Sequence, residues 1–315
     1  MKFRYPFLVL YFALAVQAGL AQNTYVPDDN FEQALIDLGY DDVLDDYVLT
    51  ANISGVTSLD VEAKEISDLT GIEDFTALTN LHCATNQLTS LDVSANTALT
   101  ILKCYSNQLT SLDVSANTAL TELHCYANHP LTSLDVSSNV LLTYLSVRDN
   151  SLTSLDVSNN TALTSLNCYG NELTSLDLSN NTALTSLTCF SNQLTSLDVS
   201  SNTALTNLDC SRNDLTSLDV SANTALTTLK CYSNSLDILD VSNNTALTNL
   251  ECNNNSLTYL NMKNGITDAL TYFVATNNSL TCIETLDPDY ATANWTYANG
   301  NIDEGVEFSV VCAPE

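Results

Sequence analysis

Basic residues are scarce in this chain of 315 residues. Eight lysines and arginines stand against 37 aspartates and glutamates, which gives a formal net charge of −29 at pH 7. Two of the eight, Lys2 and Arg4, lie in an N-terminal segment that we expect to be removed, and their loss makes the charge −31. Binders of nucleic acid and of anionic membranes need basic surfaces, so the composition argues against both partners. It suits a soluble extracellular protein, whose acidity also helps to keep a long chain in solution.

Long apolar segments are absent beyond the N-terminus. There, Lys2 and Arg4 precede the short apolar stretch FLVLYFALAV, and the small residues GLA follow at 19–21. This pattern is typical of a secretory signal peptide, and its apolar part is too short for a membrane anchor. We therefore expect residues 1–21 to be a signal peptide, with no cysteine behind it for lipid attachment and no transmembrane segment elsewhere. The expected location is secreted, extracellular or associated with the cell surface.

Glycine is nearly absent from the middle of the chain, and a phrase of 21 residues recurs there without a helical period. Its first half reads L-x-x-L-x-C-x-x-N-x-L and its second half T-S-L-D-V-S-x-N-T-A. In one copy, a period of two puts Leu102 and Cys104 inward, so that Lys103 and Tyr105 point outward. The L-D-V segment alternates in the same way. Each coil thus offers two short strands, and we expect parallel pairing between coils to build one sheet on each side.

The recurring phrase resembles the leucine-rich repeat, in its bacterial 21-residue form with the nested pattern LxxLxLxxNxLxxLDLxxN, as in internalin-like binding modules. The resemblance covers about eleven copies between Val56 and Ile283. It implies a right-handed, β-rich leucine-rich repeat solenoid of stacked parallel strands, which we expect to be a monomer. The flanks YVPDDNFEQALIDLGYDD and LTCIETLDPDYATANW resemble those of secreted Bacteroidetes repeat proteins, many of which continue into a C-terminal sorting domain. This chain stops at VVCAPE, so outer-membrane sorting is not expected.

The ends of a solenoid expose apolar edges and need caps. We therefore divide the mature chain into an N-terminal cap, a repeat array and a C-terminal cap, at residues 22–55, 56–283 and 284–315. In the first part, PDDNFEQALIDLG predicts a short helix with Phe31, Leu35 and Leu38 on one face. Gly39 is expected to end this helix. In the last part, the segment around Trp295 is expected to cover the final coil.

Asparagine recurs once in each half of the phrase, and we interpret it as structural. An inward amide can satisfy turn backbone groups of its own and of neighbouring coils, which would otherwise be buried without partners. The first ladder consists of Asn86, Asn107, Asn128, Asn150, Asn171, Asn192, Asn213, Asn234, Asn255 and Asn278. The second begins with Asn96, Asn117, Asn139 and Asn160.

Eight of the ten cysteines share one slot of the phrase, where the family usually has leucine. Their spacing lacks the close pairs of a zinc site. Because Val61, Val147 and Ala275 fill the same slot, we interpret the eight as buried free thiols. Disulfides between neighbouring coils are the alternative, since the Cα atoms would lie in range and secretion is oxidising. Cys282 and Cys312 lie outside the slot, and we expect a disulfide between them to staple the C-terminal cap.

Outward residues of the first strand combine aromatic rings with most of the basic groups of the mature chain. We select as a candidate ligand-binding face Lys103, Tyr105, His124, Tyr126, Arg148, Tyr169, Phe190, Arg212, Lys230 and Tyr232. Exposed aromatic planes beside basic and amide groups suit sugars or an extended partner protein. The expected partner is therefore an extracellular protein or a glycan. The alternative is that stacked tyrosines only stabilise the sheet.

The opposite side carries one aspartate per coil. Like charges about 4.8 Å apart repel by roughly 1 kcal/mol in a water-like dielectric, unless serine, threonine, backbone donors or cations offset the repulsion. Calcium is a weak candidate there, since it prefers carboxylate oxygens, although glycine-rich calcium-binding turns are missing. The residues concerned are Asp113, Asp135, Asp156 and Asp177. The acidic run DDVLDD at 41–46 is a second weak candidate, and no other cofactor is expected.

Catalysis would need a unique constellation of residues, and the sequence offers none that we recognise. Its three histidines, His82, His124 and His129, match no nucleophile or metal motif, so we do not expect an enzyme. The sequence predicts a secreted leucine-rich repeat module that binds a protein or glycan through the candidate face. Two alternatives are a rigid spacer or adhesin component with a cation-stabilised aspartate ladder, and an ice-binding surface on the Ser-x-Asp-x-Ser side.

Overall fold

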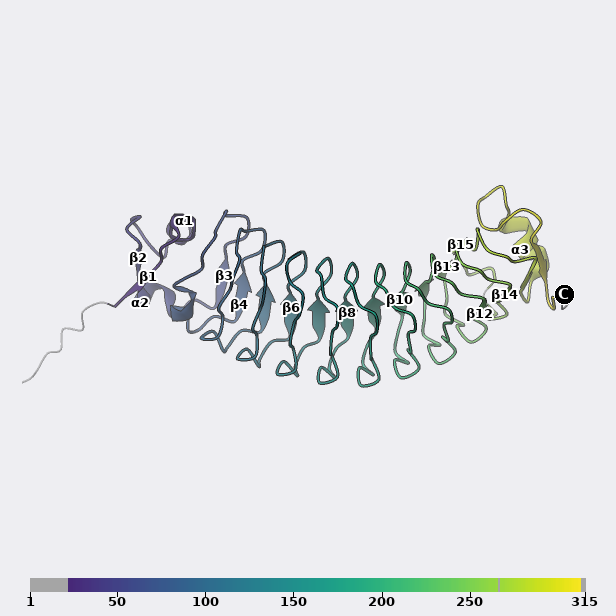
Figure 1. Cartoon of the computed structure of the whole chain (residues 1–315), viewed down its shortest axis with the longest axis horizontal. Coiled ribbons are helices and arrows are strands. Elements are labelled where there is room, and N and C mark those ends of the chain that lie inside the picture. Colours follow the sequence, from purple (N-terminus) through teal and green to yellow (C-terminus); the bar gives the residue numbers. More distant parts are fainter. Residues whose placement is uncertain (1–21, 266, 313–315) are drawn as a thin grey trace, which may run out of the picture.

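The computed structural model describes residues 22–265 and 267–312, so the expected signal peptide lies outside the described residues. The molecule is an elongated, gently bowed row of coils with cap elements at both ends (Figure 1). The repeated apolar positions of successive coils merge into one continuous core. A one-dimensional stack of this kind is a solenoid, and the prediction of a parallel, β-rich solenoid is confirmed.

Eleven strands of three residues form the main sheet along one side. They are β3 (Ser58–Asp60), β4 (Asn80–His82), β5 (Ile101–Lys103), β6 (Glu122–His124), β7 (Tyr144–Ser146), β8 (Ser165–Asn167), β9 (Ser186–Thr188), β10 (Asn207–Asp209), β11 (Thr228–Lys230), β13 (Asn249–Glu251) and β15 (Tyr272–Val274). Neighbours pair in parallel with their central residues in register, as Leu102 is with Leu81 and Leu123. The eight cysteines behind these strands are buried free thiols, in agreement with the interpretation of their slot.

The opposite side departs from the prediction of a second full-length sheet. Among the described residues, paired strands occur there toward the C-terminus, as β12 (Ile238–Asp240), β14 (Tyr259–Asn261), β16 (Cys282–Glu284) and β17 (Glu307–Ser309). Earlier coils have isolated bridges between aspartates of adjacent coils. The residue before the buried leucine explains the difference, because it is serine in the earlier coils, such as Ser111, and Ile238 or Tyr259 where strands form. Branched and aromatic side chains favour strands more than serine does.

Both asparagine ladders bond to the backbone of adjacent coils, as predicted. In the first ladder, Asn171 donates to carbonyls of its own and the preceding coil, and its amide oxygen accepts from the N–H of Leu152 at 3.0 Å. In the second ladder, Asn181 donates to the carbonyls of Val157 and Asn160, both at 3.0 Å. The buried amide oxygen of Asn181 has no donor among the described residues. Each amide thus ties its coil to the one before it.

The N-terminal cap consists of β1 (Asn23–Tyr25), α1 (Asp29–Asp37), β2 (Tyr47–Leu49) and α2 (Thr50–Ile53), followed by the 3-10 helix η1 (Ile72–Asp74). Asp28 begins α1 by accepting from two backbone N–H groups of the first turn, as N-cap residues do. Phe31 and Leu35 are buried as predicted, but Leu38 is 45% exposed. Leu38 is the C-cap residue, where the chain leaves the helix before it turns at Gly39 with φ of +80°.

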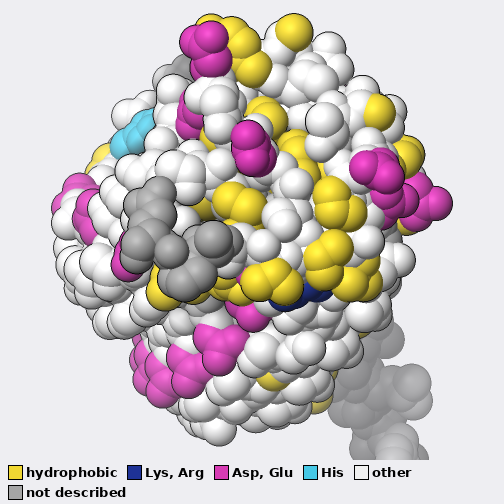
Figure 2. Space-filling view, turned by 90° about the vertical axis from the view of Figure 1, so that its right-hand side faces the viewer, with side chains coloured by type: hydrophobic (Ala, Val, Ile, Leu, Met, Phe, Trp, Pro, Cys, Tyr) yellow, Lys and Arg dark blue, Asp and Glu magenta, His cyan; other side chains and the backbone are white. Residues whose placement is uncertain are grey.

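The C-terminal cap is built on α3 (Pro288–Asn294) and β17. The buried Trp295 ring lies 4.9 Å from that of Phe273 in β15 and 5.9 Å from that of Phe308 in β17. Trp295 therefore covers the end of the array, and the expected disulfide joins Cys282 to Cys312. Hydrophobic side chains remain visible among polar ones on this end of the molecule (Figure 2). None of the helices that the structure describes has the length and apolar composition needed to cross a membrane.

Candidate binding face

The residue after the cysteine slot points outward from the main sheet, and five consecutive copies stack into one strip. We call this strip the aromatic column, and it consists of Tyr105, Tyr126, Arg148, Tyr169 and Phe190. The rings of Tyr105 and Tyr126 are 4.3 Å apart between centroids and inclined by 5°. Those of Tyr169 and Phe190 are 4.2 Å apart and inclined by 13°. The parallel register of the strands produces this stacking, and all five side chains are half-buried.

Arg148 joins the two pairs of rings. Its guanidinium carbon lies 3.9 Å from the ring centroid of Tyr126 and 5.4 Å from that of Tyr169. Its Nη1 donates to the Tyr169 hydroxyl and pairs with the Asp149 carboxylate at 3.2 Å. Burial acts to lower the pKa of Arg148, but hydrogen bonds to the two tyrosines outweigh it and raise that pKa. The five side chains therefore form a continuous column with a fixed positive charge at its centre.

The column ends at Glu62 on one side and at Ser211 on the other. The Tyr105 hydroxyl donates to Glu62 at 3.0 Å, and burial together with this bond raises the pKa of Tyr105 to about 12. Ser211 is fully buried and separates Phe190 from Tyr232 by one coil. Tyr232 is thus in line with the column but not part of its stack.

Arg212 does not lie on the strand position that the sequence analysis gave it. It follows the outward position by one residue, in a turn with φ of +52°, and it is exposed. Its guanidinium carbon lies 5.9 Å from the ring centroid of Tyr232. The left-handed turn recurs at this point of the coils, one residue beyond the outward position, so Arg212 flanks the column instead of joining it.

A second outward column, two residues earlier in each coil, contains Lys103, His124 and Lys230. Lys103 and His124 are directly in register on β5 and β6, and Lys230 pairs with Glu251 at 3.1 Å. His124 stacks on Tyr144 with 4.6 Å between ring centroids, and burial is the main cause that lowers the pKa of His124. Sequence reasoning missed Tyr144, although the same period of two places it on the outward face of β7.

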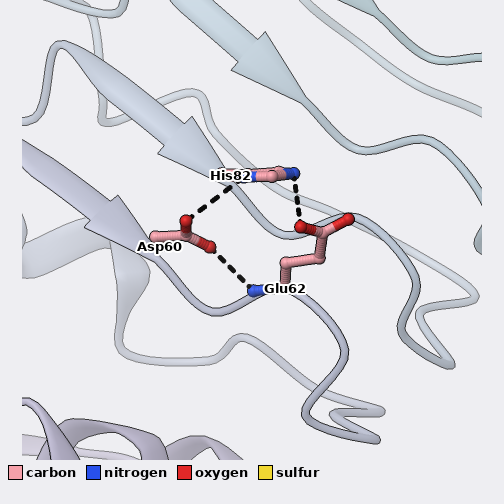
Figure 3. A group of neighbouring side chains, drawn as sticks. All are labelled: Asp60, Glu62 and His82. Atoms are coloured by element: carbon pink, nitrogen blue, oxygen red, sulfur yellow. Dashed lines mark hydrogen bonds and ion pairs between the residues drawn. The ribbon is translucent and has the colours of Figure 1, made fainter.

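Asp60 at the end of β3, Glu62 just after that strand and His82 at the end of β4 gather beside the N-terminal end of the column (Figure 3). His82 lies between two carboxylates, with its Nδ1 3.4 Å from Asp60 and its Nε2 3.5 Å from Glu62. The Tyr105 hydroxyl is 3.3 Å from the same Nε2. Each carboxylate thus has an imidazole nitrogen beside it, so contacts within the group account for this arrangement.

The aspartates of the opposite side bond to the backbone of their own coil. In each, Oδ1 accepts from the N–H of the serine two residues later, as Asp113 does from Ser115 and Asp156 from Ser158, both at 2.9 Å. Hydrogen bonding to serine lowers the pKa of these aspartates, in Asp156 despite repulsion from the neighbouring aspartates. The four weak calcium candidates are exposed, namely Asp113, Asp135, Asp156 and Asp177. Within the described residues, groups of three metal-ligating side chains lie elsewhere.

Comparison with known proteins finds similarity to two families of repeat proteins over parts of the chain. The LVIVD repeat family matches residues 134–169 and 231–252. The curated Internalin J of Listeria monocytogenes serotype 4b is 42% identical over 84 residues, which are 26% of this chain and 9% of that protein. The match therefore spans less than a tenth of that relative's length.

Two solved structures extend the similarity over most of the chain. The functional domain of InlJ from Listeria monocytogenes, which includes a cysteine ladder, has a TM-score of 0.71 and 39% identity over 87% of this chain and 66% of that chain. The Listeria monocytogenes internalin InlF has a TM-score of 0.60 and 22% identity over 92% of this chain and 97% of that chain. The chain therefore has an internalin-like leucine-rich repeat fold.

Proposed function

We propose that the chain is a secreted or cell-surface module, monomeric in solution, that binds an extracellular protein through the aromatic column and the basic residues beside it. The observation that carries the proposal is the column itself, in which five half-buried side chains from five coils form one contiguous strip. Aromatic and arginine side chains dominate the centres of protein interfaces. A leucine-rich repeat fold supports this role, since proteins with this fold bind proteins.

The stacking favours a protein over a glycan as the ligand. A sugar packs its C–H groups on the open face of an aromatic ring, where the π-electron density is negative. In the column, one face of Tyr126 is covered by Tyr105 and the other by the guanidinium of Arg148. Tyr126 therefore leaves its ring edge and hydroxyl for a ligand, which suit the mixed apolar and polar contacts of a protein interface.

The test is capture of extracellular proteins by immobilised residues 22–315, followed by affinity measurement with the captured protein after purification. The binding variant combines Tyr126→Ala, Tyr169→Ala and Phe190→Ala. We expect a loss of affinity of about 30-fold or more, as for hot-spot residues. The matched control combines Asp156→Ala, Asp177→Ala and Asp198→Ala on the opposite side, and we expect it to bind like the unmodified chain.

Circular dichroism shows whether both variants remain folded. Equal binding by the folded aromatic variant and the unmodified chain would contradict the proposal. A glycan array is run in parallel, because binding there that depends on the same aromatics would replace the protein by a glycan. If the unmodified chain binds neither kind of ligand, the spacer function takes its place.

A further inference from the structure

The N-terminal cap concentrates negative charge without a basic neighbour in sequence. Between residues 28 and 46 the chain has eight acidic side chains, and residues 22–63 contain no lysine, arginine or histidine. The ion pair that reaches into this region joins Lys64 to Asp37 at the end of α1. Three of the acidic groups, Asp29, Glu32 and Asp46, place one carboxylate oxygen each within 4.8 Å of the others.

Glu32 is the central member of this group, and it is fully buried. Its Oε1 accepts from the N–H groups of Asp45 at 2.9 Å and Tyr47 at 3.1 Å, which fastens the loop between α1 and β2 to the helix. Its Oε2 is buried and has no hydrogen-bond partner among the described residues. A buried carboxylate oxygen without a donor is rare, because buried charges are paired or bind metals.

The other two members approach Glu32 from different segments. Asp29 stands one turn earlier on α1, and side chains three residues apart share a face of a helix. Asp46 comes from the loop, where its φ of +67° turns the chain back and its carbonyl accepts from the N–H of Val26 at 2.9 Å. Both carboxylates are exposed at the surface of the cap, so the group opens to solvent on one side.

A fourth carboxylate, that of Asp41, adds to the excess of negative charge in the cap. One oxygen of Asp41 is buried without a hydrogen-bond partner among the described residues. Burial raises the pKa of Asp41, and the charges of Glu32, Asp42 and Asp45 raise it further. The loop therefore folds its carboxylates toward α1 although like charges oppose that approach, and a cation would reverse the sign of this interaction.

We propose that Asp29, Glu32 and Asp46 bind one calcium ion that locks the loop between α1 and β2 onto the N-terminal cap. All three ligands are carboxylates, which suit a hard cation better than zinc. Calcium accepts six to eight oxygens in flexible geometry, so loop carbonyls and water can complete the shell, whereas magnesium demands a near-ideal octahedron. The site is separate from the aspartate ladder and from the aromatic column, and it does not depend on the proposed binding function.

The experiment uses residues 22–315 stripped with a chelator and titrated with calcium chloride in a calorimeter. We expect one site per chain with a dissociation constant on the order of 10⁻⁴–10⁻³ M, as in extracellular calcium modules. The melting temperature should rise by several degrees in excess calcium and by much less in equal magnesium. Equal shifts with both ions, or no heat of binding, would overturn the proposal.

The variant Glu32→Gln removes the negative charge of residue 32 but keeps the hydrogen-bond acceptor that holds the loop. Glutamine keeps an oxygen that can accept from the N–H groups of Asp45 and Tyr47, so the loop should stay in place. We expect this variant to melt at least as high as the unmodified chain without calcium and to lose the calcium-dependent rise. The matched control is Asp42→Asn, an exposed acid of the same loop outside the group, which should keep the rise. Calcium binding by Glu32→Gln at unchanged affinity would overturn the proposal.

Terbium gives a local readout, because it replaces calcium and emits when a nearby tyrosine transfers excitation to it. Tyr47 follows Asp46 directly, and its ring lies 5.5 Å from that of Tyr25. We expect terbium emission that calcium displaces and that falls several-fold in the double variant Tyr25→Phe with Tyr47→Phe, while calorimetric affinity stays the same. Emission unchanged in that variant would place the ion elsewhere and overturn the assignment.

Discussion

The two sides of each coil are each built on a buried leucine, such as Leu102 and Leu112, but use their outward positions in opposite ways. On the main sheet, the residue after the cysteine slot changes between tyrosine, arginine, phenylalanine and serine from coil to coil. On the opposite side, aspartate recurs in coil after coil and accepts from the backbone N–H two residues later. Even where Asn261 replaces the aspartate, its amide oxygen accepts from the N–H of Lys263 at 3.1 Å.

This comparison separates two reasons for an outward residue. A side chain that holds the backbone of its own coil is needed in every copy, and it recurs unchanged. A side chain without such a bond is free to differ, as the outward residues on either side of the cysteine slot do. Variation between copies of one repeat thus marks the surface that is available for recognition, and repetition marks the surface that maintains the coil.

The largest effect is expected from the asparagines that support the two sides. Asn171→Ala removes the acceptor of the buried N–H of Leu152, which should cost about 3 kcal/mol once the lost carbonyl bonds are added. Asn181→Ala should cost about half as much, since the carbonyls of Val157 and Asn160 each keep a backbone donor. Urea unfolding measures both. Equal losses of unfolding free energy in the two variants, or a larger loss in Asn181→Ala, would contradict the proposed difference between the ladders.

Alkaline pH should destabilise the strand side through its thiols. Burial raises the pKa of Cys168 from 9 to about 12, so the unfolded chain ionises first. The contribution of this thiol to the free energy of unfolding is fully present below pH 9. It falls as pH rises toward 12, by about 1.4 kcal/mol per pH unit for each such thiol. Cys168→Val is the control, because Val147 fills the same slot, and its urea midpoint should fall less steeply between pH 9 and 11. Parallel pH profiles for the two chains would contradict the burial argument.

Arg148→Met tests whether the aromatic column contributes to stability. The substitution keeps an apolar stem but removes the charge over Tyr126 and the bond to Tyr169, and we expect a loss of about 1 kcal/mol. Arg212→Met is the matched control, since its guanidinium is exposed and 5.9 Å from the nearest ring centroid. A loss above about 3 kcal/mol would indicate that the column is mainly structural.

The smallest effect is expected on the aspartate side. Bonds to serine hold the pKa of Asp156 and Asp177 below the ordinary value of 3.8. The stability that these bonds provide is present above pH 3.8 and is lost as pH falls through the lowered pKa. The double variant Asp156→Asn with Asp177→Asn should therefore lose slightly less stability than the unmodified chain between pH 6 and pH 3. A gain in stability on acidification would show that repulsion outweighs these bonds.

Periodic features of the fold could be predicted from the sequence because each copy of the repeat shows the same pattern of buried and exposed positions. The alternation around Leu102 and Cys104 predicts the main sheet, and the recurring asparagines predict the ladders. The same logic overestimated the extent of strand pairing on the opposite side. The L-D-V segment alternates there as expected, but serine at positions such as Ser111 has too little preference for strands. A pattern of burial is therefore not sufficient to predict hydrogen bonding between coils.

The candidate site was predictable in position but not in contacts. Register alone places Tyr126, Arg148 and Tyr169 in consecutive coils on one face, yet the contacts of Arg148 with the two rings follow from side-chain rotamers that no sequence period encodes. The acidic group of the cap is harder still, because Glu32 and Asp46 meet only when a loop folds back onto α1. Its sequence signal was the run DDVLDD, which contains one of the three assigned ligands.

Repeated junctions between coils have a consequence for the length of the molecule. Each coil meets only its neighbours, and consecutive copies present the same leucines and amides to one another. Adding or removing a whole unit of 21 residues therefore leaves the remaining junctions of the same kind. The length of the molecule, and with it the distance that it spans, can change by whole coils without a new kind of contact in the core.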